Sequence, residues 1–341
     1  MPAGGGQMRE LTGLDPRALP PEVTQSPEPL LLRGLVADWP AVRASSQPGG
    51  VLGYLRRLDA GASVGAWLGA PEIASRFDYL PDFSGVNFAR EKMPLKAVID
   101  LLEQHAPEAQ PPAIYVGSTT VDACVPGFRE ANPLGLGAVD PNGDPLVSLW
   151  LGNRATVAAH QDLPDNLACV VAGRRRFTLL PPGQVGNLYI GPLENTLAGQ
   201  PTSLVDFEKP DLARFPRFAE AQRHAQVAEL GPGDAVFIPS MWWHHVQALE
   251  PVNLLVNCWW RRSPPHMDSP MAALLLTLMT VRDLPPEQRQ AWRHLFDHYV
   301  FDAGDDTAAH LPPPARQVLA APLDDNATRA LRARLLRRLN R

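Results

Sequence analysis

The stretch that decides the fold reads LVSLWLGNRATVAAHQDLPDNLACVVAGRRRFTLL over residues 146–180 and AVFIPSMWWHHVQALEPVNLLVNCWW over residues 235–260. It consists of short apolar runs separated by turn-forming Gly, Pro, Asn and Asp. Short strands with turn residues between them are typical of an antiparallel sandwich or barrel. The predicted strands are Leu146–Leu151, Ala155–His160, Leu167–Val171, Arg175–Leu180, Ala235–Ile238, His245–Ala248 and Asn253–Trp260.

A connection from about Pro182 to Gly231 interrupts this series. It is too long for a hairpin loop, and we predict that it carries a helix or a functional loop. Upstream, residues 29–34 and 113–117 read as short strands, and residues 93–105 have the apolar spacing of a helix.

The segment after Arg262 has a helical pattern instead. Ser269 is a predicted N-cap with Pro270 at the first helical position. Three helices are expected, over residues 270–281, 285–301 and 328–339. We therefore predict a domain over residues 1–262, with a β core at about 113–262, and a C-terminal helical segment over residues 263–341.

Composition narrows the class of protein. The chain has 341 residues, 45% hydrophobic and 20% charged, which is a globular balance. A net charge of −5 gives no whole-chain attraction to nucleic acid or to an anionic membrane. Three separated cysteines without a CxxC motif indicate a reduced compartment. With neither a signal peptide nor a membrane-spanning segment evident, we expect a cytoplasmic protein.

Two short motifs carry metal-binding side chains. His160-Gln-Asp162 ends one predicted strand, and His244-His245 begins another. Residues two apart on a strand point to the same face, so His160 and Asp162 can converge on one ion. Two histidines and a carboxylate form the facial triad of non-haem Fe(II) oxygenases, and the same ligands can hold catalytic zinc. The spacing alone favours a hydrogen-bonded pair of His160 and Asp162, with one core and one surface histidine at His244-His245.

Several linked motifs over residues 29–260 resemble a known family. These are HQDLPDNL (160–167), GRRRFTLLPP (173–182), GDAVFIPSMWWHHV (233–246) and an entry segment PLLLRG (29–34) followed by DWP (38–40). They resemble the JmjC/cupin-like (cupin 8) oxygenases, the family of the asparaginyl hydroxylase that modifies hypoxia-inducible factor. The resemblance implies a mainly β fold, an eight-stranded double-stranded β-helix or jelly roll, with N-terminal helices and the C-terminal helical segment.

The resemblance also implies cofactors and site residues. It assigns Fe(II) to His160, Asp162 and His244, and it places Arg175 where the family has a lysine for 2-oxoglutarate. A guanidinium fork also suits a carboxylate. Further implied residues are Tyr115 and Thr119 at the cosubstrate, Asn166 and Asn257 near the metal, and Trp259 and Tyr79 near the substrate. The alternatives are core packing for the aromatic residues, turn or strand-end amides for the asparagines, and a surface position for Arg175. Val157 stands where the family often has a threonine.

Strand alternation separates neighbouring residues of two motifs. Arg175 shares a face with the apolar Phe177 and Leu179, while Arg174 and Arg176 lie on the other face. We therefore expect Arg175 to point inward. Asn166 has the opposite parity, so both can point inward only if a bulge or turn intervenes. Only one of His244 and His245 can reach the metal, and the choice of His244 rests on the resemblance.

The resulting hypothesis is an Fe(II)- and 2-oxoglutarate-dependent oxygenase that hydroxylates a side chain of a protein or peptide. The alternatives are an oxygenase of a small molecule or nucleoside, and a cupin-like binding or regulatory protein with little turnover. Neither a nucleic-acid nor a membrane partner is expected. The C-terminal helices are predicted to form a homodimer, unless their apolar stripes pack on the chain's own barrel. The stripes are Met271, Leu274, Leu275 and Leu278 in the first helix, and Trp292, Leu295, Phe296 and Tyr299 in the second.

Overall fold

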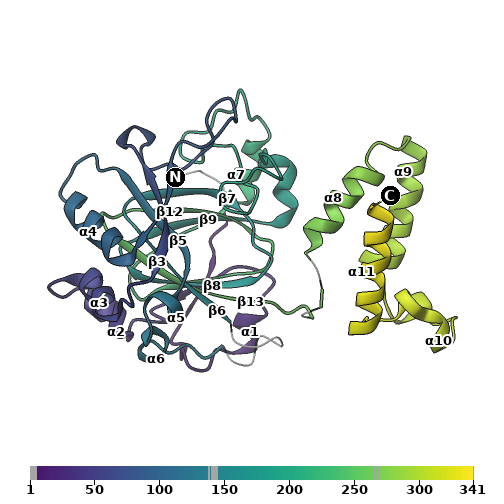
Figure 1. Cartoon of the computed structure of the whole chain (residues 1–341), viewed down its shortest axis with the longest axis horizontal. Helices are drawn as coiled ribbons and strands as arrows, with labels where there is room; N and C mark the ends of the chain where they lie inside the picture. Colours follow the sequence, from purple (N-terminus) through teal and green to yellow (C-terminus); the bar gives the residue numbers. More distant parts are fainter. Residues whose placement is uncertain (1–5, 137–138, 140–144, 265, 268, 341) are drawn as a thin grey trace. The chain divides into compact units, whose positions relative to one another are not determined.

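The computed structural model describes residues 6–136, 139, 145–264, 266–267 and 269–340. The chain forms two compact units, Met1–Arg262 and Ser263–Arg341. The strands belong to the first unit, and the second unit is helical (Figure 1).

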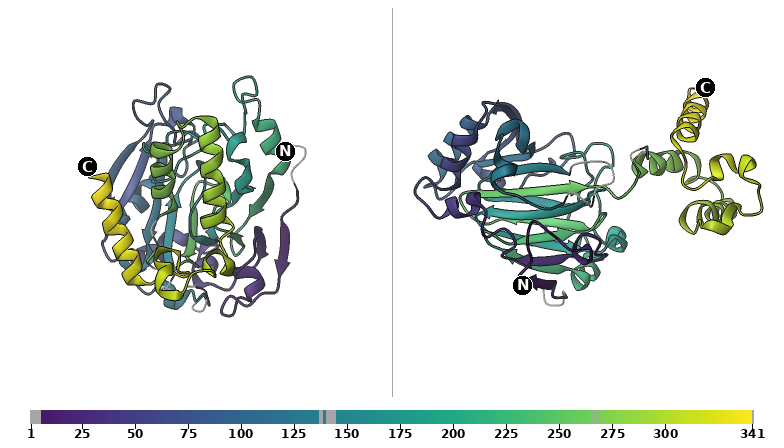
Figure 2. Two further views of the ribbon diagram at one scale, coloured as in Figure 1. Left: turned by 90° about the vertical axis from the view of Figure 1, so that its right-hand side faces the viewer. Right: turned by 90° about the horizontal axis from the view of Figure 1, so that it is seen from below.

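Eight consecutive strands build the core of the first unit, four in each of two sheets. The order β11-β8-β13-β6 forms the centre of a nine-stranded sheet, and β10-β9-β12-β7 forms a four-stranded sheet. Neighbours within each set pair antiparallel, and the chain crosses repeatedly between the sheets (Figure 2). This arrangement confirms the predicted jelly roll. The strands are β6 (Leu146–Gly152), β7 (Ala155–His160), β8 (Asp165–Ala172), β9 (Arg175–Leu180), β10 (Gln226–Leu230), β11 (Ala235–Ile238), β12 (Trp243–Ala248) and β13 (Asn253–Trp260).

The long connection after β9 contains more structure than the sequence pattern indicates. It carries a 3-10 segment (Pro182–Asn187), the predicted helix as α7 (Phe218–His224), and then β10. Strand β10 was missed because it is a short edge strand in which three of five residues are not buried. Its sequence QVAEL therefore lacks the apolar run that identifies the other strands.

The larger sheet extends beyond the jelly roll at both edges. β2 (Leu30–Arg33) pairs with β11, and β5 (Ala113–Thr120) pairs with β6, in agreement with the strands predicted at these positions. The sequence pattern did not indicate the outer strands β1 (Arg9–Thr12), β3 (Ser63–Gly69) and β4 (Ala89–Pro94). β4 reads AREKMP and is almost wholly exposed, so it offers no apolar periodicity.

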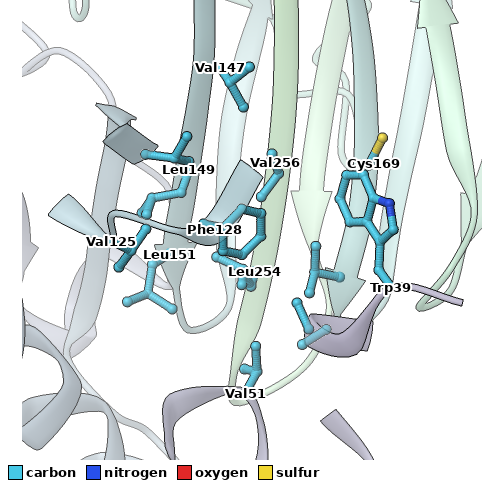
Figure 3. Packing of buried hydrophobic residues seen from close by; sticks show 14 of the residues in the cluster. Trp39, Val51, Val125, Phe128, Val147, Leu149, Leu151, Cys169, Leu254 and Val256 are labelled. Atoms are coloured by element: carbon cyan, nitrogen blue, oxygen red, sulfur yellow. The ribbon is translucent and has the colours of Figure 1, made fainter. Parts of the chain in front are cut away.

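Short helices cover one face of the larger sheet. Leu149, Leu151, Leu254 and Val256 project from the strands toward Phe128 in a single apolar cluster (Figure 3). The helices of this region are α1 (Pro21–Thr24), α2 (Pro40–Ser45), α3 (Gly50–Leu58), the predicted α4 (Leu95–His105), α5 (Val121–Cys124) and α6 (Phe128–Ala131), with a 3-10 turn at Pro71–Ile73. The opposite face of this sheet meets the four-stranded sheet, and the functional groups lie between the two.

The second unit contains the predicted C-terminal helices. Ser269 caps the first of them, since its hydroxyl accepts a hydrogen bond from the Met271 amide at 3.3 Å. Among the described residues of this unit, Ala308 is the only buried one. The elements are α8 (Pro270–Thr280), α9 (Pro286–Phe296), a π turn (Asp297–Phe301), 3-10 turns (Asp305–Ala308, Gln317–Leu319), α10 (Pro313–Arg316) and α11 (Asp325–Leu339). No helix within the described part of the chain is long and apolar enough to cross a membrane.

Candidate metal centre

Two strands of the smaller sheet bring His160, Asp162 and His244 together. One ligand atom from each residue lies within 4.8 Å of the other two. His160 ends β7 and lies directly opposite His244 of β12, and Asp162 follows two residues later. The His244 Nε2 is 3.6 Å from an oxygen of Asp162, and the two imidazole centroids are 4.2 Å apart. Three potential ligands therefore face one point.

A bulge in β7 gives His160 its direction. His244 is opposite His160, and Val246 is opposite Val157, so β7 has one extra residue between these pairs. Such a bulge changes the face to which the following side chains point. Val157, His160 and His244 therefore all line the interior between the sheets.

Backbone carbonyls orient both imidazoles. The Nδ1 of His160 lies 2.9 Å from the Ala158 carbonyl oxygen, and the Nδ1 of His244 lies 3.1 Å from that of Trp242. A carbonyl oxygen only accepts, so each Nδ1 carries a hydrogen, and in a neutral imidazole the lone pair is then on Nε2. Such outer hydrogen bonds fix the tautomer of metal-binding histidines.

Protonation in the site also suits a metal ion. Burial lowers the pKa of His160 to about 4, and the nearby His244 adds to the decrease. Burial alone would raise the pKa of Asp162, but the two imidazoles, His244 foremost, lower it below its ordinary value. A neutral imidazole and an ionised carboxylate are the forms that bind metal.

Arg175 lies in the same interior, with its guanidinium short of partners. The residue is 2% exposed, its Nη2 donates to the Trp150 carbonyl at 3.3 Å, and its Nε has no hydrogen-bond partner. Burial lowers the pKa of Arg175, and the Tyr115 hydroxyl opposes the decrease. Burial also raises the pKa of Tyr115 to about 12, so Tyr115 is neutral and supplies no countercharge. Among the described residues, no carboxylate pairs with Arg175.

The neighbouring arginines have the opposite orientation. Arg174 bonds Glu250 at 2.7 Å, and Arg176 bonds Glu229 at 2.6 Å, both on the exposed surface. The predicted conflict of parity between Asn166 and Arg175 is resolved by a turn, since β8 and β9 belong to different sheets. Gly173 makes that turn with φ of +74°, where an added Cβ would meet Asn253. Asn166 on the larger sheet and Arg175 on the smaller sheet can therefore both point into the interior between the sheets.

Side-chain amides line the inner end of the site. The Asn257 Nδ2 donates to the Asn166 Oδ1 at 3.4 Å, and the Trp150 indole donates to the Asn257 Oδ1 at 2.7 Å. Both asparagines line the small inner cavity of about 40 Å³, together with the metal-binding residues and Arg175. Trp150 was not identified from the sequence, because a tryptophan in a strand is equally expected in a core.

A larger cavity of about 470 Å³ adjoins His160 and Asp162. Trp259 and Tyr115 line it, as the resemblance led us to expect for Trp259. Its remaining walls were not identified from the sequence, because they come from separate regions of the chain. They include Trp67 of β3, Phe77, Trp150 and the segment 197–202 of the long connection.

Two predicted site residues lie outside both cavities. Thr119 is opposite Leu149, a member of the helix-covered core, and directly opposed residues share a face. Thr119 thus lies on the face of Leu149 and away from the cluster of His160, Asp162 and His244, so this geometry does not support the expected cosubstrate contact. The cause is a register shift in β5 between Val116 and Thr119, where Ser118 has a φ of +44°. Tyr79 is the second residue outside both cavities. Its hydroxyl donates a hydrogen bond to the Asn195 carbonyl at 2.7 Å, and burial raises the pKa of this hydroxyl.

The arrangement suits a divalent ion of the iron type together with a carboxylate ligand. Two imidazoles and one carboxylate leave open positions, as in the facial triad of non-haem Fe(II) oxygenases. A buried guanidinium without an anion is costly, so Arg175 calls for an anionic ligand from outside the chain. A cosubstrate with a carboxylate at each end fits both requirements of the inner cavity.

Comparisons with known proteins agree with this geometry. Residues 16–266 match the family model described as a cupin-like domain. The chain is 36% identical to Lysine-specific demethylase JMJ31 of Arabidopsis thaliana over 129 residues, which cover 36% of this chain and 23% of the relative. It is 28% identical to Jumonji C domain-containing protein 5 of Drosophila melanogaster over 234 residues, 68% of this chain and 54% of the relative.

The name of a third relative refers to tRNA. The chain is 31% identical to tRNA wybutosine-synthesizing protein 5 of Danio rerio over 183 residues, 49% of this chain and 50% of the relative. The matched parts thus span about half or less of the length of these three relatives.

Proposed function

The chain belongs to the cupin-like domain family, and from that premise we propose that it is an Fe(II)- and 2-oxoglutarate-dependent oxygenase that hydroxylates a polypeptide side chain. The observation that carries the proposal is the joint presence, in one interior, of the His160, Asp162 and His244 cluster and a buried Arg175 that has no carboxylate partner among the described residues. A cluster of metal-binding side chains alone, or a buried arginine alone, would fit many classes of protein. Together they match a metal ion and an anionic cosubstrate.

Each residue has a defined part in this proposal. His160, Asp162 and His244 would hold Fe(II), and Arg175 would bind the distal carboxylate of 2-oxoglutarate through a charge-assisted hydrogen bond. Asn166 and Asn257 offer amide groups beside them. Bound iron would supply the activation of O2, so that one oxygen atom would end in succinate as 2-oxoglutarate loses CO2 and the other would be inserted into a C–H bond of the substrate. The aromatic residues around the outer cavity would limit the access of water.

Turnover of 2-oxoglutarate tests the proposal. The full chain with Fe(II), O2 and 2-oxoglutarate should form succinate, and Asp162→Ala should abolish this activity. Arg174→Ala, a surface change next to β9, should retain it. Normal metal and 2-oxoglutarate binding without succinate formation, even with cell lysate as the source of substrate, would favour the binding or regulatory alternative.

The fate of the product separates hydroxylation from demethylation. Hydroxylation of a carbon leaves a stable product 16 Da heavier, whereas hydroxylation of an N-methyl group releases formaldehyde. We propose the stable product, which mass spectrometry of treated lysate proteins would detect. Formaldehyde in amounts equal to succinate would identify a demethylase instead.

We further propose that the C-terminal unit pairs with a second copy of the chain. Its apolar side chains are widely exposed, with Trp292 at 46%, Leu295 at 45% and Tyr299 at 46%. A helical unit with a single buried residue among those described has almost no core of its own. An exposed apolar surface of this kind usually marks an interface.

A further inference from the structure

The outer cavity beside the metal ligands has strongly aromatic walls. Five aromatic side chains line it, and they come from strands of the larger sheet and from the segment after β3. They are Trp67, Phe77, Tyr115, Trp150 and Trp259. Several pack against one another, for example Tyr115 with Trp150 at 6.1 Å and Trp150 with Trp259 at 5.8 Å between ring centroids. The walls therefore support one another.

The described walls of this cavity contain no lysine or arginine side chain. Among the same described residues, the only carboxylate is the metal ligand Asp162. Nearby cations are engaged elsewhere. Arg90 donates to the Leu197 carbonyl at 2.7 Å, and Arg76 pairs with Asp78 and Asp206 at 2.9 and 3.0 Å.

We propose that the outer cavity admits an uncharged or cationic polypeptide side chain and excludes carboxylate and phosphate groups. The inference rests on the proposed function in taking this cavity as the substrate entrance. An anion removed from water needs a countercharge, and the described walls include no lysine or arginine to supply one. Their donors are neutral groups such as the hydroxyls of Ser118 and Thr202 and the amide of Gln200. Aromatic faces, in contrast, attract cations and pack well on apolar groups.

The same reasoning favours a polypeptide over a nucleic acid. Recognition of RNA or DNA depends largely on lysine and arginine contacts to phosphates. The described walls of the entrance lack such contacts, and the chain has a net charge of −5. A nucleotide would have to keep its phosphate well outside the cavity.

One wall of the cavity offers a position for changing this selectivity. Gln200 lines it within the segment 197–202, beside Leu197, whose carbonyl accepts from Arg90. A cation at position 200 would face the cavity on a segment that is already held in place. Gln222 of α7 provides the matched control, because it lines a separate cavity on the outer face of the smaller sheet.

Ligand-detected NMR on the full chain tests the proposal without turnover. The protein is loaded with Mn(II) in place of iron and saturated with 2-oxoglutarate, so that Arg175 is occupied. The probes are the N-acetyl amides of leucine, asparagine, lysine, aspartate and phosphoserine, together with uridine 5′-monophosphate. We expect the first three to bind at least tenfold more tightly than the last three. Trp67→Leu should weaken their binding, which places them in this cavity.

Two glutamine variants test whether the charge of the cavity wall determines which probes bind. Gln200→Arg should improve binding of the aspartate and phosphoserine probes at least tenfold and weaken the lysine probe, whereas Gln222→Arg should change neither. Uridine monophosphate binding as tightly as the neutral amides, with sensitivity to Trp67→Leu, would overturn the inference in favour of a nucleotide substrate. Equal binding of all the amides would overturn the charge selection. Failure to bind Mn(II) or 2-oxoglutarate in the same samples would contradict the proposed oxygenase instead.

Discussion

His244 and His245 are neighbours in sequence but lie on opposite faces of β12. His244 faces Asp162 inside the barrel at 3.6 Å, whereas His245 stacks on Phe207 outside it with ring centroids 4.6 Å apart. Both histidines are buried, so burial does not distinguish them. The alternation of side chains along β12 distinguishes the two histidines. Each histidine can therefore serve as the control for a substitution of the other.

We predict that His244→Ala removes metal binding and His245→Ala does not. Loss of an outer hydrogen-bond partner of a metal ligand typically costs 10–100-fold in affinity, so loss of a ligand itself should cost at least about a hundredfold. Calorimetric titration with Mn(II) measures both variants. Circular dichroism should accompany it, because His245 is buried and its loss affects packing. Retained affinity in His244→Ala with loss in a folded His245→Ala would invert the assignment.

The three consecutive arginines at the start of β9 give a second prediction. Arg175→Ala should weaken 2-oxoglutarate binding by tens-fold or more, because losing one partner of a buried ion pair costs ~2–5 kcal/mol. Arg174→Ala and Arg176→Ala should stay near wild type, since their surface pairs with Glu250 and Glu229 contribute little. Isothermal titration of the Mn(II)-loaded protein measures all three. Equal small effects would leave the cosubstrate carboxylate without an identified partner.

The contrast between Arg175 and Thr119 shows how far the sequence could lead. Alternation within β9 correctly predicted which arginine points inward, because that strand is regular. The same reasoning cannot follow a residue through an irregular strand. The register shift in β5 turns Thr119 toward the helix-covered core, and the bulge in β7 turns His160 inward. The bulge in β7 has no signal in the amino-acid pattern, whereas the shift in β5 coincides with Gly117, and a glycine inside a strand often marks a bulge.

The central fold was predictable and the entrance to the site was not. The jelly-roll strands bury residues on both sides, so they read as short apolar runs, and seven of them were identified. The outer walls of the site come from residues as distant in sequence as Trp67 and Gln200. Tertiary packing alone brings these residues together. Linked motifs around His160 and His244 pointed to the side chains that the structure brings together as a candidate metal site, but not to those of the outer cavity.

Packing of the larger sheet gives a third prediction. Leu149 and Leu146 lie on β6, but Leu149 is 0% exposed within the apolar cluster of Figure 3 and Leu146 is 47% exposed. Leu149→Ala should lower the free energy of unfolding by about 2–5 kcal/mol, as expected for a buried leucine. Leu146→Ala should change it by less than about 0.5 kcal/mol. Urea denaturation followed by tryptophan fluorescence compares them, and similar losses in both would contradict the assigned burial.

The last prediction concerns the exposed apolar surface of α9. Leu295 lies on this helix near Trp292, and both side chains are almost half exposed. If two copies pair through this surface, light scattering at micromolar concentration should give about twice the mass of the 37.2 kDa chain. Leu295→Glu would place a charge in the interface, where a central contact is worth about 2 kcal/mol or more, and should weaken the dimer at least about 30-fold. Gln290→Glu adds the same charge at an exposed polar position of the same helix and should leave the dimer intact. A monomer mass for the unmodified chain, or equal weakening by both variants, would contradict pairing through α9.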